Sequence, residues 1–119
     1  MALPRKNRLT KKKDIDTVFK EGNAVKGNFL FIRYKQISAP GPHLSFIVSK
    51  KVAGSAVERN RLRRILAETI RKNIQNFKKG YEVAIVSKKN GEENLMIAEM
   101  LKLLNGRLFY DEVNSNKNN

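Results

Sequence analysis

The side chains best suited to chemistry gather in the segment 55–64, SAVERNRLRR. Four arginines and one asparagine stand within Arg59–Arg64, and Lys50-Lys51 precede them. Guanidinium forks and the N–H groups of a helix N-terminus both bind phosphate oxygens. The alternative interpretation is an ordinary solvated helix face. Two features argue against it: the cations in the early helical turns are unfavourable to the helix dipole, and the run lacks the alternating charges of such a face. The segment therefore predicts a phosphate- or nucleic-acid-binding surface.

Residues for catalysis by the protein itself are sparse. His43 is the only histidine and falls in a predicted loop. Two acidic pairs, Asp14/Asp16 and Glu92/Glu93, stand near the starts of predicted helices, where carboxylates complement the dipole. The sequence also has no cysteine, no glycine-rich phosphate loop and no HExxH. We therefore expect neither a catalytic site nor a metal site in the protein.

Aromatic residues lie among cations between positions 26 and 35. Phe29 and Phe31 alternate onto one face of a predicted strand, and Tyr34 points to the other. Core packing is one interpretation of these residues. The other is an open sheet face that stacks single-stranded bases, at about 1–3 kcal/mol per base.

Composition favours a polyanionic partner. The 119 residues carry 25 Lys and Arg against 11 Asp and Glu, a formal net charge of +14. No apolar run is long enough to cross a bilayer, and MALPRKNRLTKKK is neither a secretory signal nor a good transit peptide. The absence of cysteine is compatible with a cytoplasmic protein, the location that we expect.

Periodicity predicts the elements that position these residues. Ser55 and Glu58 match a capping box at the start of the main helix. Thr10 can cap the first helix. The predicted elements are a helix over 11–21, strands over 28–37 and 43–49 that pair as a hairpin, a helix over 55–77, a buried central strand over 81–86 and a helix over 92–105.

The order α-β-β-α-β-α indicates an α+β protein, a small two-layer sandwich with helices over one sheet face. A strand, a helix and another strand invite parallel pairing. Residues 1–10 are predicted to be a basic arm with little structure of its own, 11–110 one RNA-binding domain, and 111–119 a disordered tail.

The segment SKKVAGSAVERNRLRR resembles the signature of the bacterial ribonuclease P protein subunit. In that family a strand ends in Ser-Lys-Lys, and after a short turn a helix begins Ala-Val-x-Arg-Asn-Arg-x-[Lys/Arg]-Arg. Weaker similarity includes Asn7-Arg8-Leu9, the first helix ending at Gly22, the strand to Tyr34, and Tyr81–Val86 followed by two lysines.

The resemblance implies a protein cofactor of a ribozyme that removes the 5′ leader from precursor tRNA with Mg²⁺ bound mainly by the RNA subunit. It implies a ribosomal-protein-like fold with a left-handed β-α-β crossover, the exception to the usual hand. Partners would be ribonuclease P RNA and precursor tRNA. Contacts to the RNA subunit are implied for Arg59, Asn60, Arg61, Arg63 and Arg64, and contacts to the leader for Ile15, Phe19, Phe31, Tyr34, Lys50 and Lys51.

The sequence departs from the family pattern at two informative positions. Ile15 stands where phenylalanine is common, so an apolar surface replaces a stacking one. Ala67 stands where another basic residue is common.

Other classes of protein remain as alternatives. A ribosomal or ribosome-assembly protein would share the charge and size but would lack a leader cleft. A DNA-binding regulator would need a short helix before the basic one, where we predict a strand. A membrane-surface helix would carry more bulky aromatic residues than segment 55–77 does.

Overall fold

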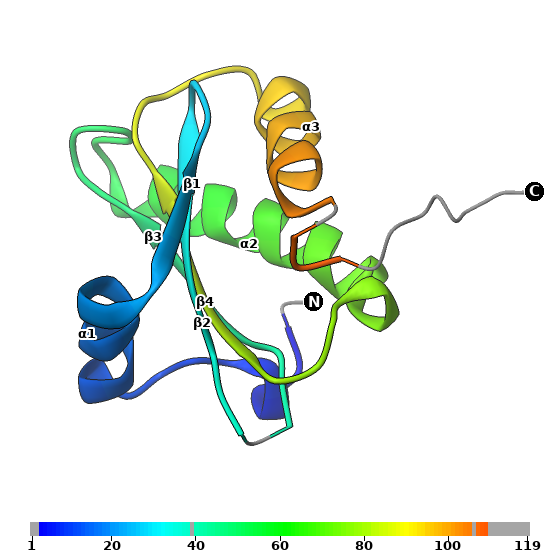
Figure 1. The fold of residues 1–119 in the computed structure, drawn as a ribbon. Helices are drawn as coiled ribbons and strands as arrows, with labels where there is room; N and C mark the ends of the chain where they lie inside the picture. Colours follow the sequence, from blue (N-terminus) through cyan, green and yellow to red (C-terminus); the bar gives the residue numbers. More distant parts are fainter. Residues whose placement is uncertain (1–2, 39, 106, 110–119) are drawn as a thin grey trace, which may run out of the picture.

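The structure is a computed structural model that describes residues 3–38, 40–105 and 107–109 (Figure 1). Its elements confirm the α+β class and the predicted order, with one added strand. They are the 3-10 turn η1 (Arg5–Asn7), α1 (Lys12–Glu21), β1 (Asn23–Lys26), β2 (Leu30–Gln36), β3 (His43–Val48), α2 (Ala56–Lys72), the 3-10 turn η2 (Ile74–Asn76), β4 (Tyr81–Ser87) and α3 (Glu93–Leu104).

The strands form one sheet in the order β1-β2-β4-β3. The short strand β1, which the sequence did not predict, pairs antiparallel with β2 at the sheet edge. β4 lies between β2 and β3, antiparallel to the first and parallel to the second. The predicted hairpin of 28–37 with 43–49 is therefore wrong, because the apolar strand β4 takes the central place. The parallel crossover through α2 is confirmed, whereas its hand stays a prediction.

The sheet is covered on both faces (Figure 1). Helices α2 and α3 pack on the face that carries Leu30, Ile32, Val83 and Ile85, all of them fully buried. Helix α1 lies on the other face, where Val18 packs against the residues of a smaller cluster that includes Ala84. The prediction that the helices cover a single face is wrong for α1, because alternation along β2 and β4 gives both faces apolar residues.

Helix α2 follows the predicted stripe: Leu62, Leu66 and Ile70 are buried in the main core. In α3 the buried face is formed by Met96, Met100 and Leu104, one helical turn apart. Ile97 and Leu101 lie at its edge, while Leu95 and Ala98 are exposed.

The N-terminal arm is docked, contrary to the prediction that it has little structure. Leu3 and Leu9 are buried, and Arg8 forms a parallel bridge with Leu44 of β3. The Leu9 amide donates to the Leu44 carbonyl at 2.7 Å. Burial of these leucines offsets the entropy cost of ordering the arm. The predicted disordered tail, 111–119, lies outside the described residues.

The starts of helices α1 and α2 differ in their caps. Ser55 caps α2: its hydroxyl accepts from the Glu58 amide at 3.1 Å, which confirms the serine half of the predicted capping box. The Glu58 carboxylate accepts from the Ser55 hydroxyl at 3.3 Å. In α1 the cap position is Lys11, which makes no side-chain capping bond, so the prediction for Thr10 is wrong.

Candidate nucleic-acid interface

A cleft of about 370 Å³ opens on the sheet face that carries α1. Phe19 near the end of α1 and Phe31 of β2 form its aromatic walls. Ala24 and three cations, Lys26, Arg33 and Lys88, complete the lining. With no carboxylate among these residues, the cleft combines ring surfaces with positive charge, which suits a single-stranded nucleic acid.

Arg33 ties the end of α1 to the sheet. Its guanidinium donates to the backbone carbonyl of Phe19 and, at 3.3 Å, to that of Gly22. The same group lies 6.0 Å from the centre of the Phe19 ring. Carbonyls at a helix C-terminus lack partners within the helix and attract cations. Arg33 therefore fixes the position of the Phe19 backbone at the cleft.

The side chain of Arg33 also retains an unused donor. Its Nε is buried and has no hydrogen-bond partner among the described residues. An unsatisfied buried donor costs about 1–3 kcal/mol.

The structure brings some of the predicted leader residues together and separates others. Phe19 and Phe31 line the same cleft, and Ile15 packs below them in the cluster that holds α1 on the sheet. Tyr34 alternates onto the opposite face, where its ring meets Tyr81 edge-on at 6.1 Å. The prediction that Tyr34 shares a cleft with Phe31 is wrong, because the two residues are three positions apart along β2, and an odd spacing puts side chains on opposite faces.

Phe29 is also absent from the cleft. It precedes β2, so strand alternation no longer sets its direction, and it packs against the main core. Glu99 of α3 holds this turn: its carboxylate accepts from the amides of Asn28, Phe29 and Leu30 at 2.7–2.8 Å. Lys89 lies 5.7 Å from the Phe29 ring centre.

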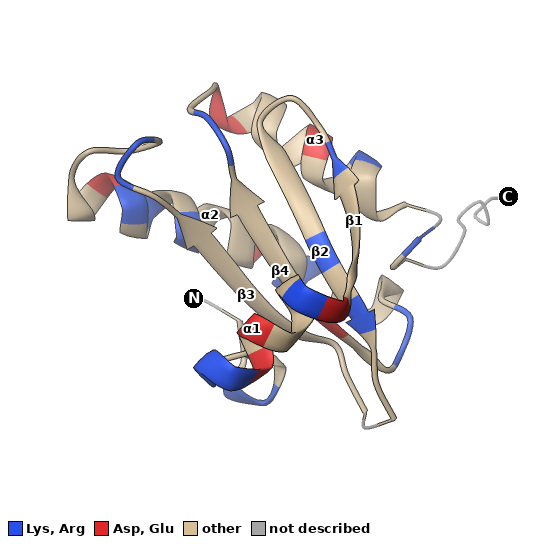
Figure 2. Cartoon of the chain, turned by 60° about the vertical axis from the view of Figure 1, so that its left-hand side comes forward, with Lys and Arg blue, Asp and Glu red and all other residues tan. Residues whose placement is uncertain are grey.

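Lysines lie at the carboxyl ends of three strands, all at the same end of the sheet. Lys50 and Lys51 follow β3, Lys88 follows β4, and Lys26 ends β1. These three strands run in the same direction, so their carboxyl ends lie at the same end of the sheet (Figure 2). Lys88 donates to the Gly27 carbonyl at 2.9 Å. Lys50 and Lys51 are exposed and adjoin the start of α2.

The five α2 residues predicted to contact the RNA subunit divide into two that bind other parts of the protein and three that line a second cavity. Arg59 donates to the carbonyls of Ala53 and Gly54 at 3.1 and 3.0 Å, so it braces the turn that holds the lysines. Arg61 pairs with Glu93 of α3 at 3.0 Å. These two guanidiniums are partly engaged within the protein.

Three further residues of α2 face the N-terminal arm and β3. Arg63 donates to the side chain of Asn60, and both line a second cavity with Arg64. Asn60 and Arg64 are exposed, and Arg63 is half-buried. Neither arginine pairs with a carboxylate in the part of the chain that the structure describes. Of the four arginines in Arg59–Arg64, Arg63 and Arg64 are the two that no carboxylate or backbone carbonyl of the described residues engages.

Sequence reasoning missed Lys26, Arg33 and Lys88 as cleft residues. Alternation could have found Arg33, two residues after Phe31 on the same strand. Lys26 could not be placed because strand β1 was not predicted, and Lys88 could not because β2 and β4 are distant in the sequence. The described residues contain no cluster of three His, Cys, Asp or Glu side chains able to hold a metal ion. No described helix is long and apolar enough to span a membrane.

The family described as Ribonuclease P matches residues 3–108 of the sequence. The chain belongs to the ribonuclease P protein family. The ribonuclease P protein component of Vesicomyosocius okutanii is 32% identical over 110 residues, which cover 91% of this chain and 96% of the relative. That of Finegoldia magna is 39% identical over 87 residues, 72% of this chain and 74% of the relative.

The fold agrees with this assignment. The structure of the Staphylococcus aureus ribonuclease P protein superposes with a TM-score of 0.80 over 87% of this chain and 98% of that one, at 18% identity. As a ribonuclease P protein, the chain is a subunit of the ribonucleoprotein endonuclease that processes tRNA. Membership in this family favours that role over the ribosomal alternative. The DNA-binding alternative also fails, because a strand, β3, precedes α2.

Proposed function

We propose that α2 binds the catalytic RNA of ribonuclease P while the cleft beside α1 holds the 5′ leader of precursor tRNA. The protein thereby promotes Mg²⁺-dependent removal of the leader. The RNA supplies the chemistry and binds most of the Mg²⁺. The proposal requires that the protein work in the cytoplasm, where we expect both RNAs to be.

The leader proposal rests on one observation: Phe19 and Phe31 line the same basic cleft. Two aromatic walls offer stacking surfaces to unpaired bases, and every base has a face that can stack. Lys26 and Lys88 stand where they can neutralise the backbone. A folded tRNA helix presents paired bases, so the cleft favours the single-stranded leader.

A leader would also find hydrogen-bond donors in the cleft. Lys88 is held at the cleft by its hydrogen bond to the Gly27 carbonyl and has further N–H donors, and bases and phosphates both present acceptors. Stacking is tolerant of sequence, whereas a fixed donor is selective for acceptors in one place. We therefore expect modest sequence preference at one leader position.

The catalytic RNA requires a different surface. Arg63, Arg64 and Asn60 project from α2 on the side of β3, away from the strands β1 and β2 that line the cleft. Exposed guanidiniums bind phosphates in paired or unpaired RNA without reading sequence. Lys50 and Lys51, at the carboxyl end of β3 and just before α2, suit the RNA backbone near the cleavage site.

A reconstitution assay tests the proposal. Purified protein is added to a bacterial ribonuclease P RNA and a precursor tRNA with a 5′ leader, at near-physiological salt and low Mg²⁺. We expect cleavage only when protein and RNA are both present. Protein alone is the control for catalysis by the protein. Unchanged cleavage by the RNA from the same species would reject the proposal and return the ribosome-associated alternative.

A further inference from the structure

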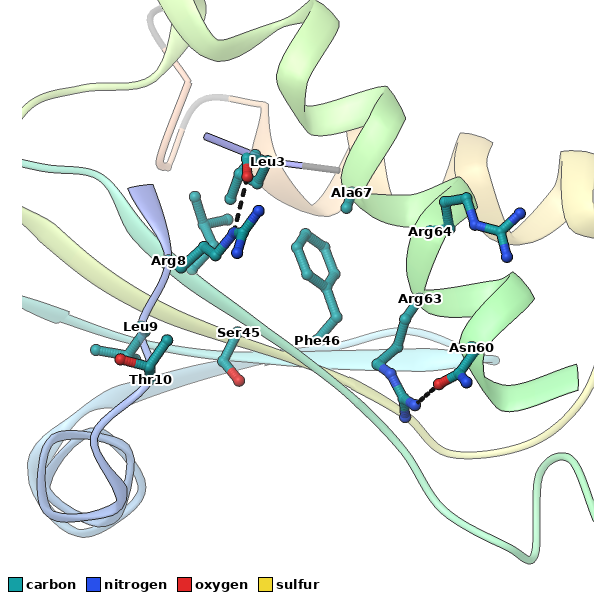
Figure 3. Close-up of a pocket in the computed structure, with 11 residues that line it drawn as sticks. Leu3, Arg8, Leu9, Thr10, Ser45, Phe46, Asn60, Arg63, Arg64 and Ala67 are labelled. Atoms are coloured by element: carbon teal, nitrogen blue, oxygen red, sulfur yellow. Dashed lines mark hydrogen bonds between the residues drawn. The ribbon is translucent and has the colours of Figure 1, made fainter. Parts of the chain in front are cut away.

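A second cavity, of about 520 Å³, lies at the β3 edge of the sheet (Figure 3). The N-terminal arm forms one wall, β3 the floor and α2 the other wall. Its apolar surface comes from Leu3, Leu9, Leu44, Phe46 and Ala67. The leader cleft lies toward the opposite edge, at β1 and β2.

Among the described residues that line this cavity, Phe46 is the one with an aromatic ring. It is half-buried and packs on the main core, and its ring stands between the arm and α2 in Figure 3. Alternation puts Phe46 with Leu44 on the α2 side of β3. The ring therefore combines a fixed position with an accessible surface, which a planar group can contact.

Positive charge flanks the ring on both sides. Arg8 of the arm uses its Nε to donate to the Leu3 carbonyl at 2.9 Å, and its terminal amino groups make no ion pair with a described residue. Arg63 stands on the opposite wall with Asn60. None of the described residues that line the cavity carries a carboxylate. An apolar floor between two guanidiniums complements a flat apolar group that carries an anion on each side.

We propose that this cavity takes one unpaired nucleotide of the ribonuclease P RNA, with its base against Phe46 and its flanking phosphates on Arg8 and Arg63. An unpaired nucleotide has the required chemistry: a planar base between two phosphodiesters. The volume accommodates a base and its ribose. This inference rests on the proposed function, because α2 is the surface assigned to that RNA.

The docked arm gains a role from this arrangement. Burial of Leu3 and Leu9 and the bridge to Leu44 hold Arg8 beside the cavity. The arm and α2 together form a site that neither forms alone. The base contact would let the protein recognise an unpaired position in the RNA, beyond general attraction to phosphate.

A cavity-filling variant tests the site without changing charge. Ala67 lines the cavity from α2, so Ala67→Leu places three extra carbon atoms against its space. Ala98→Leu is the matched control, since Ala98 is exposed on α3. We expect Ala67→Leu to weaken binding to ribonuclease P RNA about tenfold, in the range of one stacked base. The dependence of affinity on salt should stay unchanged, because the variant retains every cation that neutralises a phosphate.

The outcomes separate the two proposals. If the wild-type protein fails to bind ribonuclease P RNA, the proposed function itself is wrong. If the wild type binds and a folded Ala67→Leu protein binds equally well, only the nucleotide site is wrong. The ratio of affinities for precursor and mature tRNA reports on the leader cleft and should not change.

Crosslinking keeps the inference testable if Ala67→Leu does not fold. The sequence has no cysteine, so Thr10→Cys introduces a single thiol at an exposed residue of the cavity rim. A short photoreactive group on this thiol should join one or two adjacent unpaired nucleotides in the bound RNA. Ala98→Cys with the same group is the control. Crosslinks at Thr10→Cys that fall only in helical RNA, or match the control, would overturn the site.

Discussion

The cleft beside α1 and the arginine face of α2 bind by different physical means. In the cleft, Phe19 is held in place by Arg33, which donates to the carbonyls at the end of α1. On α2, Arg64 is exposed and Arg63 donates only to Asn60 of the same helix. The cleft is therefore preorganised, while α2 presents arginine side chains that no other element of the described structure holds in place.

The difference predicts two kinds of specificity. A preorganised aromatic cleft distinguishes single-stranded from folded RNA. Stacking on its rings needs no counterion release, while Lys26 and Lys88 add a salt-dependent part to its affinity. A face of exposed guanidiniums provides affinity that falls steeply with salt. The four variants below, each with a control, test whether the cleft and the α2 face differ in this way.

The largest effect is expected from Arg63→Ala combined with Arg64→Ala. Charge-assisted hydrogen bonds contribute about 1.5–3 kcal/mol each, so binding to ribonuclease P RNA should weaken by about two orders of magnitude. The slope of log affinity against log salt should flatten by about 0.7–0.9 for each phosphate that the variant no longer neutralises. Filter binding across a salt series measures both quantities.

A charge-matched control for that double substitution is Lys79→Ala with Lys102→Ala, both exposed and away from the cavity. It removes the same charge and should change affinity little. Equal losses in the two double variants would mean that net charge, and not the α2 face, determines assembly.

Phe19→Ala should weaken binding of precursor tRNA by about tenfold, within the about 1–3 kcal/mol of one stacked base. Binding of mature tRNA, which lacks the leader, should stay within twofold. Affinities for both tRNAs to the assembled ribonucleoprotein provide the comparison. Phe29→Ala is the matched control, because Phe29 is half-buried but lies outside the cleft. A folded Phe19→Ala protein with equal losses for both tRNAs would remove the leader assignment.

Arg33→Lys should lower the preference for precursor over mature tRNA by several-fold. Arg33 reaches both carbonyls at the end of α1 through one terminal nitrogen, Nη2. Lysine keeps the charge, but its side chain is shorter and lacks the planar group near the Phe19 ring. Removal of these hydrogen bonds should also reduce the free energy of unfolding by about 1 kcal/mol. Urea denaturation and the precursor-to-mature affinity ratio measure the two effects.

The reverse exchange, Lys35→Arg, is the control for Arg33→Lys. Lys35 is on the same face of β2 and pairs with Glu21 at 3.0 Å. An arginine can retain that pair, so we expect little change. If Arg33→Lys leaves the affinity ratio intact, the position of Phe19 does not depend on the guanidinium.

The smallest effect is expected from Glu93→Gln, which releases Arg61 from its surface ion pair. Such pairs contribute about 0–1 kcal/mol, so stability should fall slightly. Affinity for ribonuclease P RNA should rise by about twofold, since one guanidinium becomes available and one negative charge is removed. Glu92→Gln makes the same charge change in the neighbouring residue. An equal rise in both variants would assign the effect to net charge and exclude a role for the freed Arg61.

Most of α2 could be predicted from the sequence, because a helix is a local structure. The 3,4 spacing of Leu62, Leu66 and Ile70 specifies the buried stripe and leaves Asn60 and Arg64 on the exposed side. The capping box locates the helix start. The central place of β4 was also predictable, from its continuous apolar run.

The cleft could be predicted only in part. Phe19 and Phe31 were named through a family resemblance, and alternation alone would have excluded Tyr34 from their face. The exposed four-residue strand β1 has too weak a pattern to detect, yet it supplies Ala24 and Lys26. The docked arm was missed because two isolated leucines among cations show no periodicity.

The sequence by itself determined that this chain has a cationic helix with a buried apolar stripe, a central apolar strand and the signature of an RNA-binding family. These properties follow from residue type and from spacing within a few helical turns. Only the tertiary structure decided that α1 lies on the face opposite α2, that Arg33 holds Phe19, and that Arg8 and Phe46 share a cavity with α2. Each of these depends on strand order and register, which are selected by burial across the whole sheet.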